Sequence, residues 1–246
     1  MLEYTRLDHI MAYLQEHHTA TVVNLAKRLY ASEATIRRDL TTLEQRGLLK
    51  RLHGGAVLVD DAHREVPLYM REQQNVQAKK AIAAKAAEHL RDGQVIFLDA
   101  SSTAMLMIPY FENYQNLTII TNGLKTAQEL SRLSHKTYCT GGLMLHNSSA
   151  YVGSYAADFV RHFNADIFFF SSRGLTEDGR ITDASSEENH IRQVMLQNSR
   201  MHVFLCDSSK IGKLYCYNLC TVKDVTDWIT DRNKPQQKSV PRGQEL

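Results

Sequence analysis

Apolar residues recur three or four positions apart through the first 45 residues of the chain, which predicts three short amphipathic helices. The first spans about residues 4–17, the second begins at Thr21, and the third runs from Ser32 to Gly47. Ser32 suits a helix start because its hydroxyl can accept a backbone N–H, and Gly47 suits the left-handed position after a last turn. The short turn Tyr30–Ala31 between the last two helices predicts a helix-turn-helix. The inward-facing positions are Leu7, Ile10, Met11, Leu14, Val22, Val23, Leu25, Ala26, Leu29, Ile36, Leu40 and Leu43.

Two strand-like runs flank Gly54-Gly55 in the next segment, and this pattern predicts a β-hairpin over residues 48–59. A hairpin directly after a helix-turn-helix makes the predicted domain a winged helix. Arg51 and His53 lie near the tip of this wing, where we expect contact with phosphate or the minor groove.

The face of the third helix opposite its apolar stripe carries small, hydroxylated and arginine side chains. Small residues allow a helix to approach the major groove closely, and arginine can donate to guanine O6 and N7. The alternative is an ordinary solvated helix face. Seven basic and three acidic residues between Lys27 and Arg51 favour DNA, because a basic patch attracts phosphates. The predicted DNA-binding residues are Ser32, Ala34, Thr35, Arg37, Arg38, Thr42, Arg51 and His53.

Beyond a helical pattern over residues 68–90, strand-length apolar runs alternate with amphipathic helical segments. This alternation predicts an α/β domain with a mostly parallel sheet. The predicted strands are 95–98, 117–121, 137–140, 167–171, 201–206 and a shorter one near 218–222, and the helices between them are 103–111, 124–133, 155–163 and 186–199.

A polar turn follows each of the first five predicted strands, and ligands of parallel sheets bind beyond the carboxyl ends of the strands. Each turn alone is explained as well by helix capping, but five at one edge predict a pocket for a small, phosphorylated, hydroxyl-rich molecule. In it, Asp99 or Asp207 could accept sugar hydroxyls and Lys210 could pair with phosphate. The predicted effector-binding residues are Asp99, Ser101, Ser102, Thr103, Thr121, Asn122, Gly141, Gly142, Arg173 and Lys210.

Length and composition favour two domains in a chain of 246 residues that is 43% hydrophobic. We expect a winged helix over 1–59, a linker and connecting helix over 60–77, a sensor domain over 78–231, and a disordered tail over 232–246. The chain has no apolar run of about 18 residues, no signal-peptide pattern and no disulfide framework, so we expect a cytoplasmic protein without a membrane span. Cys216 and Cys220 could ligate a metal if helical, but no further ligands follow at a suitable spacing, so we expect free thiols and no metal or cofactor.

The stretch V-V-N-L-A-K-R-L-Y-A-S-E-A-T-I-R-R-D-L-T-T-L-E-Q-R-G-L-L-K-R-L-H-G-G-A resembles the signature of the DeoR family of bacterial transcription regulators. The turns D-A-S-S-T, T-N-G, T-G-G and D-S-S-K resemble that family's effector-domain motifs, and the match extends to about Trp228. The resemblance implies a sensor domain similar in fold to ribose-5-phosphate isomerase, which binds a phosphorylated sugar and thereby alters operator affinity. The chain departs from the pattern at Ser171-Ser172-Arg173 and at Ala100-Ser101. The matching residues are Ser32, Thr35, Arg37 and Arg38 at the DNA face and Lys79, Ile82 and Ala83 in the first sensor helix.

We therefore predict a repressor of a sugar-metabolism operon that binds double-stranded operator DNA and a phosphorylated sugar and forms a homo-oligomer, a dimer or larger. We expect no enzymatic activity. One alternative is a sugar-phosphate isomerase-like enzyme in which Asp99 or Glu187 acts as base, although Glu187 also suits the start of the helix at Ser186. Another is a binding module with a vestigial pocket. The apolar run from Met105 to Phe111 is a candidate subunit interface.

Overall fold

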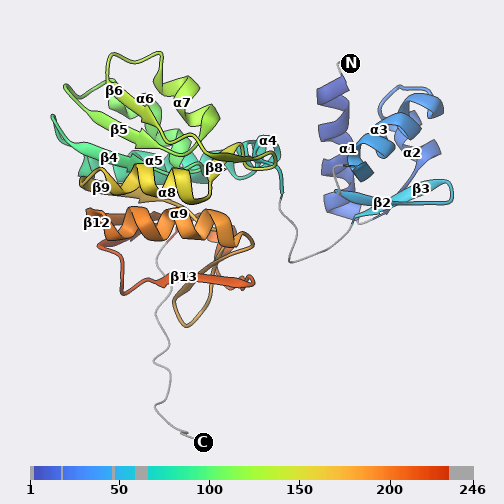
Figure 1. Ribbon diagram of the computed structural model, residues 1–246. Coiled ribbons are helices and arrows are strands. Elements are labelled where there is room, and N and C mark those ends of the chain that lie inside the picture. Colours follow the sequence, from blue (N-terminus) through green and yellow to red (C-terminus); the bar gives the residue numbers. More distant parts are fainter. Residues whose placement is uncertain (1–2, 18, 46–47, 59–65, 233–246) are drawn as a thin grey trace, which may run out of the picture. The chain divides into compact units, whose positions relative to one another are not determined.

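The computed structural model describes residues 3–17, 19–45, 48–58 and 66–232, apart from a few side chains (Figure 1). The chain divides into two compact units, Met1–Ala62 and His63–Leu246, which we describe separately. The expected ending of a helix at Gly47, most of the expected linker, and nearly all of the expected disordered tail lie outside the described residues.

The first unit is a winged helix, as predicted. Its helices are α1 (Glu3–His17), α2 (Val22–Arg28) and α3 (Glu33–Gln45), and its strands are β1 (Thr19–Thr21), β2 (Leu49–Leu52) and β3 (Gly55–Leu58). The wing strands β2 and β3 pair antiparallel, and β3 also pairs with β1. A side chain at Gly55 would lie 2.3 Å from the carbonyl oxygen of Ala20, so the close pairing of β1 and β3 requires glycine there.

The core of this unit contains most of the predicted apolar positions, among them Ile10, Leu14, Ile36 and Leu43. Val23 is an exception: we expected it to face inward, but it is 48% exposed, because α2 turns by about 100° per residue and the buried Val22 takes the inward-facing position.

The second unit is built on a six-stranded sheet in which every pair of neighbours is parallel. Consecutive side chains of its central strands point to opposite faces: Phe169 belongs to one buried cluster, and Phe168 and Phe170 belong to the other. The expected α/β architecture with a mostly parallel sheet is confirmed. In spatial order the strands are β14 (Asp227–Ile229), β12 (Ser199–Leu205), β9 (Ala165–Phe170), β4 (Val95–Leu98), β5 (Thr118–Thr121) and β6 (Lys136–Cys139).

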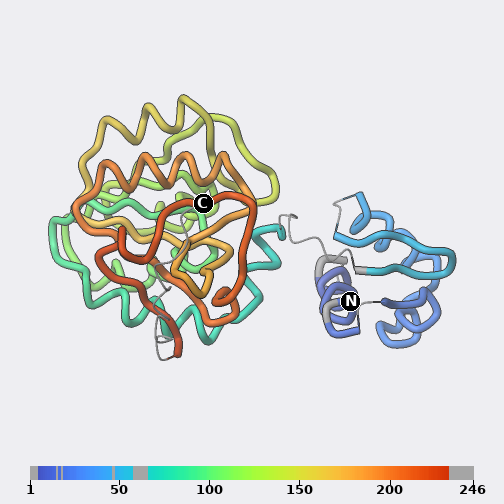
Figure 2. Tube along the Cα trace, turned by 90° about the horizontal axis from the view of Figure 1, so that it is seen from below, coloured from blue at the N-terminus to red at the C-terminus, as the bar shows by residue number. Residues whose placement is uncertain are grey.

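Helices cover both faces of this sheet (Figures 1 and 2). One buried cluster includes side chains of α5 (Val76–Ala86), the 3-10 helix η2 (Ala104–Met107) and α6 (Ile108–Phe111). The last residue of α7 (Leu124–Leu130) belongs to the same cluster. The other cluster includes side chains of α8 (Ser154–Arg161) and α9 (Ser186–Gln197), which lie side by side in both views. No helix among the described residues is long and apolar enough to cross a membrane.

Several elements differ from the sequence expectation. The helical pattern over 68–90 contains two helices, α4 (Leu68–Gln73) and α5, separated at Asn75, which has a left-handed φ of 53°. The strand expected near 218–222 is β13 (Tyr217–Thr221), and it belongs to a small antiparallel sheet with β10 (Gly174–Leu175) and β11 (Arg180–Asp183). The remaining elements are the hairpin β7 (Leu143–Leu145) and β8 (Ala150–Val152), the helix α7 (Leu124–Leu130), and the 3-10 helices η1 (Ala87–His89) and η3 (Ser208–Lys210).

The apolar run considered as a subunit interface mostly faces inward. Met107 and Phe111 are fully buried in the sheet core, and Leu106 and Tyr110 pack against it. The two short helices η2 and α6 turn this run so that more of its side chains reach the core than one face of a single helix would allow.

Candidate functional site

The order of the strands brings three of the five polar turns together. Strands β12, β9 and β4 are neighbours at the centre of the sheet, so the turns that follow them meet at one edge. From β4 the chain proceeds to β5 and β6 on one side and then returns to β9 on the other. A reversal of this kind opens a crevice at the carboxyl ends of the strands, where α/β proteins bind ligands.

A cavity of about 160 Å³ lies at this point. Six of the side chains that line it are cationic and two are carboxylates, an excess of positive charge that suits an anionic ligand of small size. Its lining residues are Val66, Arg71, Gln74, Asn75, Lys79, Ser101, Ser102, Ser171, Ser172, Arg173, Asp183, Arg192, Asp207, Ser209, Lys210, Lys213 and Tyr215.

Lys210 lies between the turns after β12, β9 and β4. Its Nζ donates to Ser171 Oγ at 2.8 Å and lies 3.5 Å from Thr103 Oγ1. It also lies 3.4 Å from Asp207 Oδ2. The ammonium lowers the pKa of Asp207 against the opposing effect of burial. Asp207 is therefore ionised at neutral pH, and its carboxylate holds Lys210 beside the cavity.

Lys79, on α5, is the second lysine of the cavity and is almost completely buried. Its Nζ donates to Ser102 Oγ at 3.0 Å and to the carbonyl oxygen of Arg71. Burial and, to a smaller extent, the nearby Lys210 ammonium together lower the pKa of Lys79 to about 8. An anion between the two lysines would reverse this effect, because it would stabilise the charged form of Lys79.

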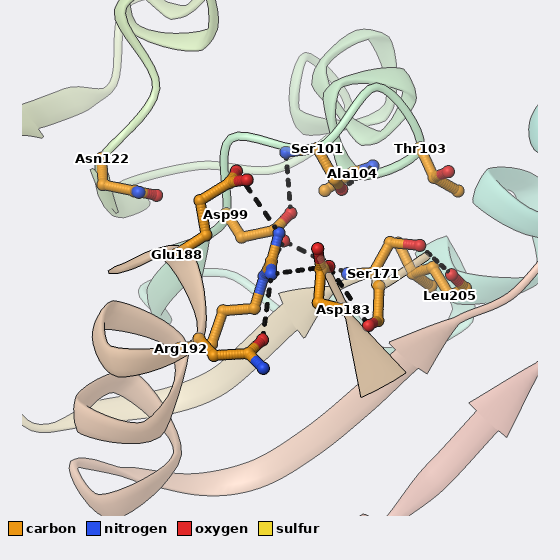
Figure 3. Close-up of polar contacts among 12 residues, drawn as sticks. Asp99, Ser101, Thr103, Ala104, Asn122, Ser171, Asp183, Glu188, Arg192 and Leu205 are labelled. Atoms are coloured by element: carbon orange, nitrogen blue, oxygen red, sulfur yellow. Dashed lines mark hydrogen bonds and ion pairs between the residues drawn. The ribbon is translucent and has the colours of Figure 1, made fainter. Parts of the chain in front are cut away.

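Beneath the cavity, the fully buried Arg192 of α9 binds three carboxylates (Figure 3). Its guanidinium lies 3.1 Å from Asp99 Oδ2, 2.9 Å from Asp183 Oδ2 and 3.5 Å from Glu188 Oε1. These charges raise the pKa of Arg192 despite its burial. The cluster joins the end of β4, the end of β11 and the start of α9, and it therefore fixes the floor of the cavity.

Both carboxylate oxygens of Asp99 accept hydrogen bonds in this floor of the cavity. Oδ1 accepts from the backbone N–H of Ser101 at 3.0 Å, and Oδ2 accepts from Arg192 and from the backbone N–H of Ser171 at 3.3 Å. The predicted sugar-binding carboxylate is thus occupied by groups of the protein, and it is Asp207, the other candidate, that lines the cavity.

The Ser171-Ser172-Arg173 segment, at which the chain departs from the family pattern, forms part of the wall. Ser171 Oγ donates to the carbonyl oxygen of Leu205 at 2.5 Å, and Ser172 Oγ donates to the carbonyl oxygen of Thr182 at 2.5 Å. Arg173 Nε lies 3.4 Å from Asp183 Oδ1. The two serines bind neighbouring strands, and the arginine adds a cation to the cavity.

Helix α4 and the turn after it form another wall, through Arg71, Gln74 and Asn75. Asn75 Nδ2 donates to Asp207 Oδ1 at 3.2 Å and to Ser209 Oγ at 2.9 Å. On the other side of α4, Glu72 Oε2 lies 2.5 Å from Lys125 Nζ of α7. We expected residues 60–77 to connect the two domains, and the described part of this segment also lines the cavity.

Six of the ten predicted effector residues lie outside the cavity lining, and four of these belong to the ends of β5 and β6, one and two strands farther along the sheet. Thr121 Oγ1 accepts from the backbone N–H of Gly123 at 3.0 Å, and Asn122 Nδ2 donates to the carbonyl oxygen of Tyr151 at 3.1 Å. A side chain at Gly142 would lie 2.8 Å from the carbonyl oxygen of Val152, so packing of the β7–β8 hairpin accounts for glycine there. The same lining contains Ser101, Ser102, Arg173 and Lys210 from the prediction, whereas Asp99 and Thr103 lie behind it and Thr121, Asn122, Gly141 and Gly142 lie away from it.

Sequence patterns did not single out several of the charged residues that line the cavity. Arg192 is an arginine within the apolar stripe of a predicted helix, four positions after Glu188, and this pair was the available signal. Asp183 and Lys213 lie on or beside strands that the pattern did not predict, so no spacing related them to the sheet edge. Arg71 and Asn75 lie in a segment that composition marks only as a connection.

Metal ligation finds no support in the geometry. The described part of the chain contains no group of three or more His, Cys, Asp or Glu side chains that could hold an ion. Cys220 lies on a strand and Cys216 just before it, so the helical spacing required for a shared metal does not arise. Burial raises the pKa of Cys220 to about 12, which keeps it a thiol at neutral pH.

In the first unit, the predicted DNA-reading face of α3 is open to solvent. Ser32 Oγ accepts from the backbone N–H of Thr35 at 3.1 Å, which confirms its place as the helix cap. Ala34, Arg37 and Arg38 are exposed, whereas Thr42 is half-buried and its hydroxyl donates to the carbonyl oxygen of Arg38 at 3.1 Å.

The remaining arginine contacts order this face. Arg37 pairs with Glu33 one turn earlier at 2.7 Å. Arg51, on the wing, donates from Nη1 to Thr41 Oγ1 at 2.6 Å, so the guanidinium bridges wing and helix. His53 is exposed at the turn of the wing. The arrangement leaves Arg38 as the exposed arginine of α3 that makes no ion pair among the described residues.

Two family models match the chain, one on each unit. Residues 6–62 match the DeoR-like helix-turn-helix domain, and residues 74–232 match the DeoR C-terminal sensor domain. The HTH-type transcriptional regulator GolR of Listeria innocua is 33% identical over 94% of this chain and 91% of its own. The lactose phosphotransferase system repressor of Staphylococcus epidermidis is 31% identical over 97% and 96%.

The similarity to solved structures is more distant. Ribose 5-phosphate isomerase A from Methanocaldococcus jannaschii has a TM-score of 0.44 and 19% identity over 57% of each chain. The delta subunit of eIF2B from Chaetomium thermophilum has a TM-score of 0.49 and 16% identity over 68% of this chain and 60% of that one. The two domain matches and the near full-length similarity to named regulators show that the chain belongs to the DeoR family of DNA-binding transcription regulators.

Proposed function

We propose that the protein represses genes of sugar metabolism and that a phosphorylated sugar in the cavity of the second unit controls its binding to operator DNA. The cationic lining of that cavity is the observation that carries this proposal, because a neutral sugar would not require six positive side chains. The names of relatives agree with it, since one of them is a repressor of a lactose phosphotransferase system.

In this account Lys210 and Lys79 bind the phosphate group. Both ammonium groups lie near the turn after β4, Lys79 on Ser102 and Lys210 near Thr103. Asp207 and the neighbouring Ser209 accept and donate hydrogen bonds with sugar hydroxyls, and Arg173 supplies a chain-specific contact at the opposite wall. A ligand of this kind would replace the mutual repulsion of the lysines with attraction to a shared anion.

In this proposal, the effect of ligand binding is transmitted to the DNA-binding unit through the segment that begins at Val66. This segment follows the first unit directly in sequence and lines the cavity with Arg71, Gln74 and Asn75. A ligand that draws Asn75 and α4 toward it therefore acts on the chain that leads to the winged helix. Allosteric coupling of this kind is typically worth about 1–3 kcal/mol. We further propose a homodimer, in which two reading helices contact half-sites about one DNA turn apart.

Thermal unfolding of the purified full chain with a panel of pentose and hexose phosphates tests the ligand. A ligand at a hundredfold excess over its dissociation constant should stabilise the protein by about 2.7 kcal/mol. The same panel without phosphate is the first control, and the Lys210→Ala variant is the second. Stabilisation by every sugar alike, or by none, would contradict the proposal and favour a vestigial pocket.

An isomerase-like enzyme is the second candidate. The surroundings of Asp99 and Glu187, the two carboxylates considered as its base, argue against it. Asp99 is bound by Arg192 and by two backbone N–H groups, so neither oxygen is available as a base. Glu187 is largely exposed, and hydrogen bonds at the start of α9 lower its pKa. Multiple-turnover formation of an isomerised sugar phosphate by the wild-type protein, lost on Lys210→Ala, would establish the enzyme instead.

A further inference from the structure

The turn between α2 and α3 closes α2 with a left-handed residue, across which the backbone N–H of Ala31 donates to the carbonyl oxygen of Ala26 at 3.1 Å. The fold of the first unit therefore accounts for the conformation at this position, but not for the tyrosine side chain that occupies it. Tyr30 has a φ of 50°, in the left-handed region, where glycine, asparagine and aspartate are tolerated far better than a bulky side chain. Its side chain is 97% exposed, so packing does not compensate for this conformation. Among the described residues, no hydrogen-bond partner is found for the phenol hydroxyl.

Tyr30 lies between basic residues and the start of the predicted recognition helix, which is a position where a residue can contact DNA. It precedes the α3 cap Ser32 by two residues and follows the exposed basic residues Lys27 and Arg28 at the end of α2. In a helix-turn-helix, the start of the second helix enters the major groove while the first helix crosses the backbone. The turn between them therefore lies at the rim of the groove, where phosphates are the nearest groups.

We propose that Tyr30 donates a hydrogen bond from its hydroxyl to a phosphate of the operator beside the groove that α3 reads. Tyrosine is among the side chains that bind DNA phosphates. The side chain of Tyr30 extends into solvent, where a bound duplex would meet it.

Two substitutions distinguish the effect of the phosphate contact from the effect of the left-handed backbone conformation at position 30. Tyr30→Phe removes only the hydroxyl, and Tyr30→Asn also places a residue that tolerates the left-handed region. Both variants should bind DNA about tenfold more weakly, the size expected for one lost hydrogen bond to a charged group. Tyr30→Asn should unfold at the same or a higher temperature than the wild-type protein.

Two duplexes serve as probes: one selected by the wild-type protein from a random-sequence pool, and one unselected. A phosphate contact carries no sequence information, so affinity should fall by a similar factor on both. Because tyrosine is uncharged, the slope of log affinity against log salt should stay unchanged, whereas loss of a cation that contacts phosphate would lower it by about one. Tyr155→Asn, at a tyrosine that is 82% exposed in the other unit, is the matched control and should bind both duplexes normally.

The result that overturns this proposal is simple to recognise. If Tyr30→Phe binds DNA as tightly as the wild-type protein, the hydroxyl makes no contact, whatever Tyr30→Asn does. A loss confined to the selected duplex would also overturn it, since that pattern indicates a contact with a base.

Discussion

Two buried cations, Lys79 and Arg192, have opposite roles at the scale of single residues. Arg192 is balanced by three carboxylates and is charged whether or not a ligand is present. Among the described residues, Lys79 donates hydrogen bonds to one hydroxyl and one carbonyl oxygen, and Lys210 repels it. Its ammonium therefore loses its proton at a lower pH than that of an ordinary lysine. Arg192 fixes the floor of the cavity, and we propose that the charge of Lys79 responds to a ligand in it.

The pKa of Lys79 should make the proposed ligand binding pH-dependent. A phosphate beside the ammonium raises that pKa above its value of about 8 in the free protein, so binding takes up protons near pH 8. Affinity should fall, by up to about tenfold per pH unit, as pH rises above 8. Calorimetry at pH 8 in two buffers of different ionisation enthalpy should show uptake of a fraction of a proton. The Lys79→Met variant should show none, and equal uptake by both proteins would contradict this role.

Arg192→Leu should be strongly destabilising, because it leaves Asp99, Asp183 and Glu188 buried around an apolar side chain. Loss of one partner from a buried ion cluster typically costs about 3–5 kcal/mol. Urea unfolding of the full chain, followed by tryptophan fluorescence from Trp228 in the second unit, measures this. Arg200→Ala is the control: that arginine is mostly exposed, its pair with Asp166 is 3.8 Å long, and its loss should cost less than about 1 kcal/mol. Equal costs for both variants would show that the buried cluster is not held by Arg192.

At the scale of elements, the recognition helix α3 could be read from sequence because its signals are local. The cap at Ser32, the apolar stripe and the exposed arginines all lie within one helix. The walls of the cavity could not be read in this way, since α4, β11 and α9 meet only in the folded unit. The pattern also gave no sign of the break at Asn75, where a left-handed residue divides an otherwise helical run. Local chemistry was predictable, and its assembly at the sheet edge depended on strand order.

Arg38→Ala should weaken binding to a selected operator duplex while the sensor unit stays intact. A guanidinium that reads guanine contributes about 1–3 kcal/mol, or roughly fivefold to a hundredfold in affinity. The stabilisation by a sugar phosphate in a thermal-shift assay should equal that of the wild-type protein. Loss of both properties together would indicate that the arginine serves the fold and not the DNA contact.

Breaking the contact between α4 and α7 should uncouple the two sites. Lys125→Met removes the partner of Glu72, which anchors the wall of the cavity on the side away from Asn75. We expect near-normal binding of operator and of sugar phosphate measured separately, with a weaker effect of one on the other. Arg132→Ala, which breaks the exposed pair with Glu129 near the same helix, is the control. Unchanged coupling in Lys125→Met would show that α4 does not carry the signal.

At the scale of the whole molecule, the chain consists of a helix-turn-helix domain and a sensor domain, and the described part of the segment between them, from Val66 onward, belongs to the second unit. The order of elements allowed both units to be predicted, because helical and strand periodicities alternate clearly along the chain. Of the small sheet of β10, β11 and β13, only β13 was predicted as a strand, since the other two strands are short and β11 and β13 are distant in sequence. It supplies Asp183 and lies near Tyr215, and so it completes the cavity to which three of the five polar turns contribute.

The measurement that tests the central claim most directly is release of a fluorescently labelled operator duplex, followed by anisotropy as sugar phosphates are added to the wild-type complex. One phosphorylated sugar should release the duplex at concentrations that also stabilise the free protein, and its unphosphorylated form should not. The Lys210→Ala complex should bind the duplex normally and keep it. If a sugar phosphate stabilises the protein but leaves anisotropy unchanged, or if the Lys210→Ala complex responds as the wild type does, the cavity does not control DNA binding.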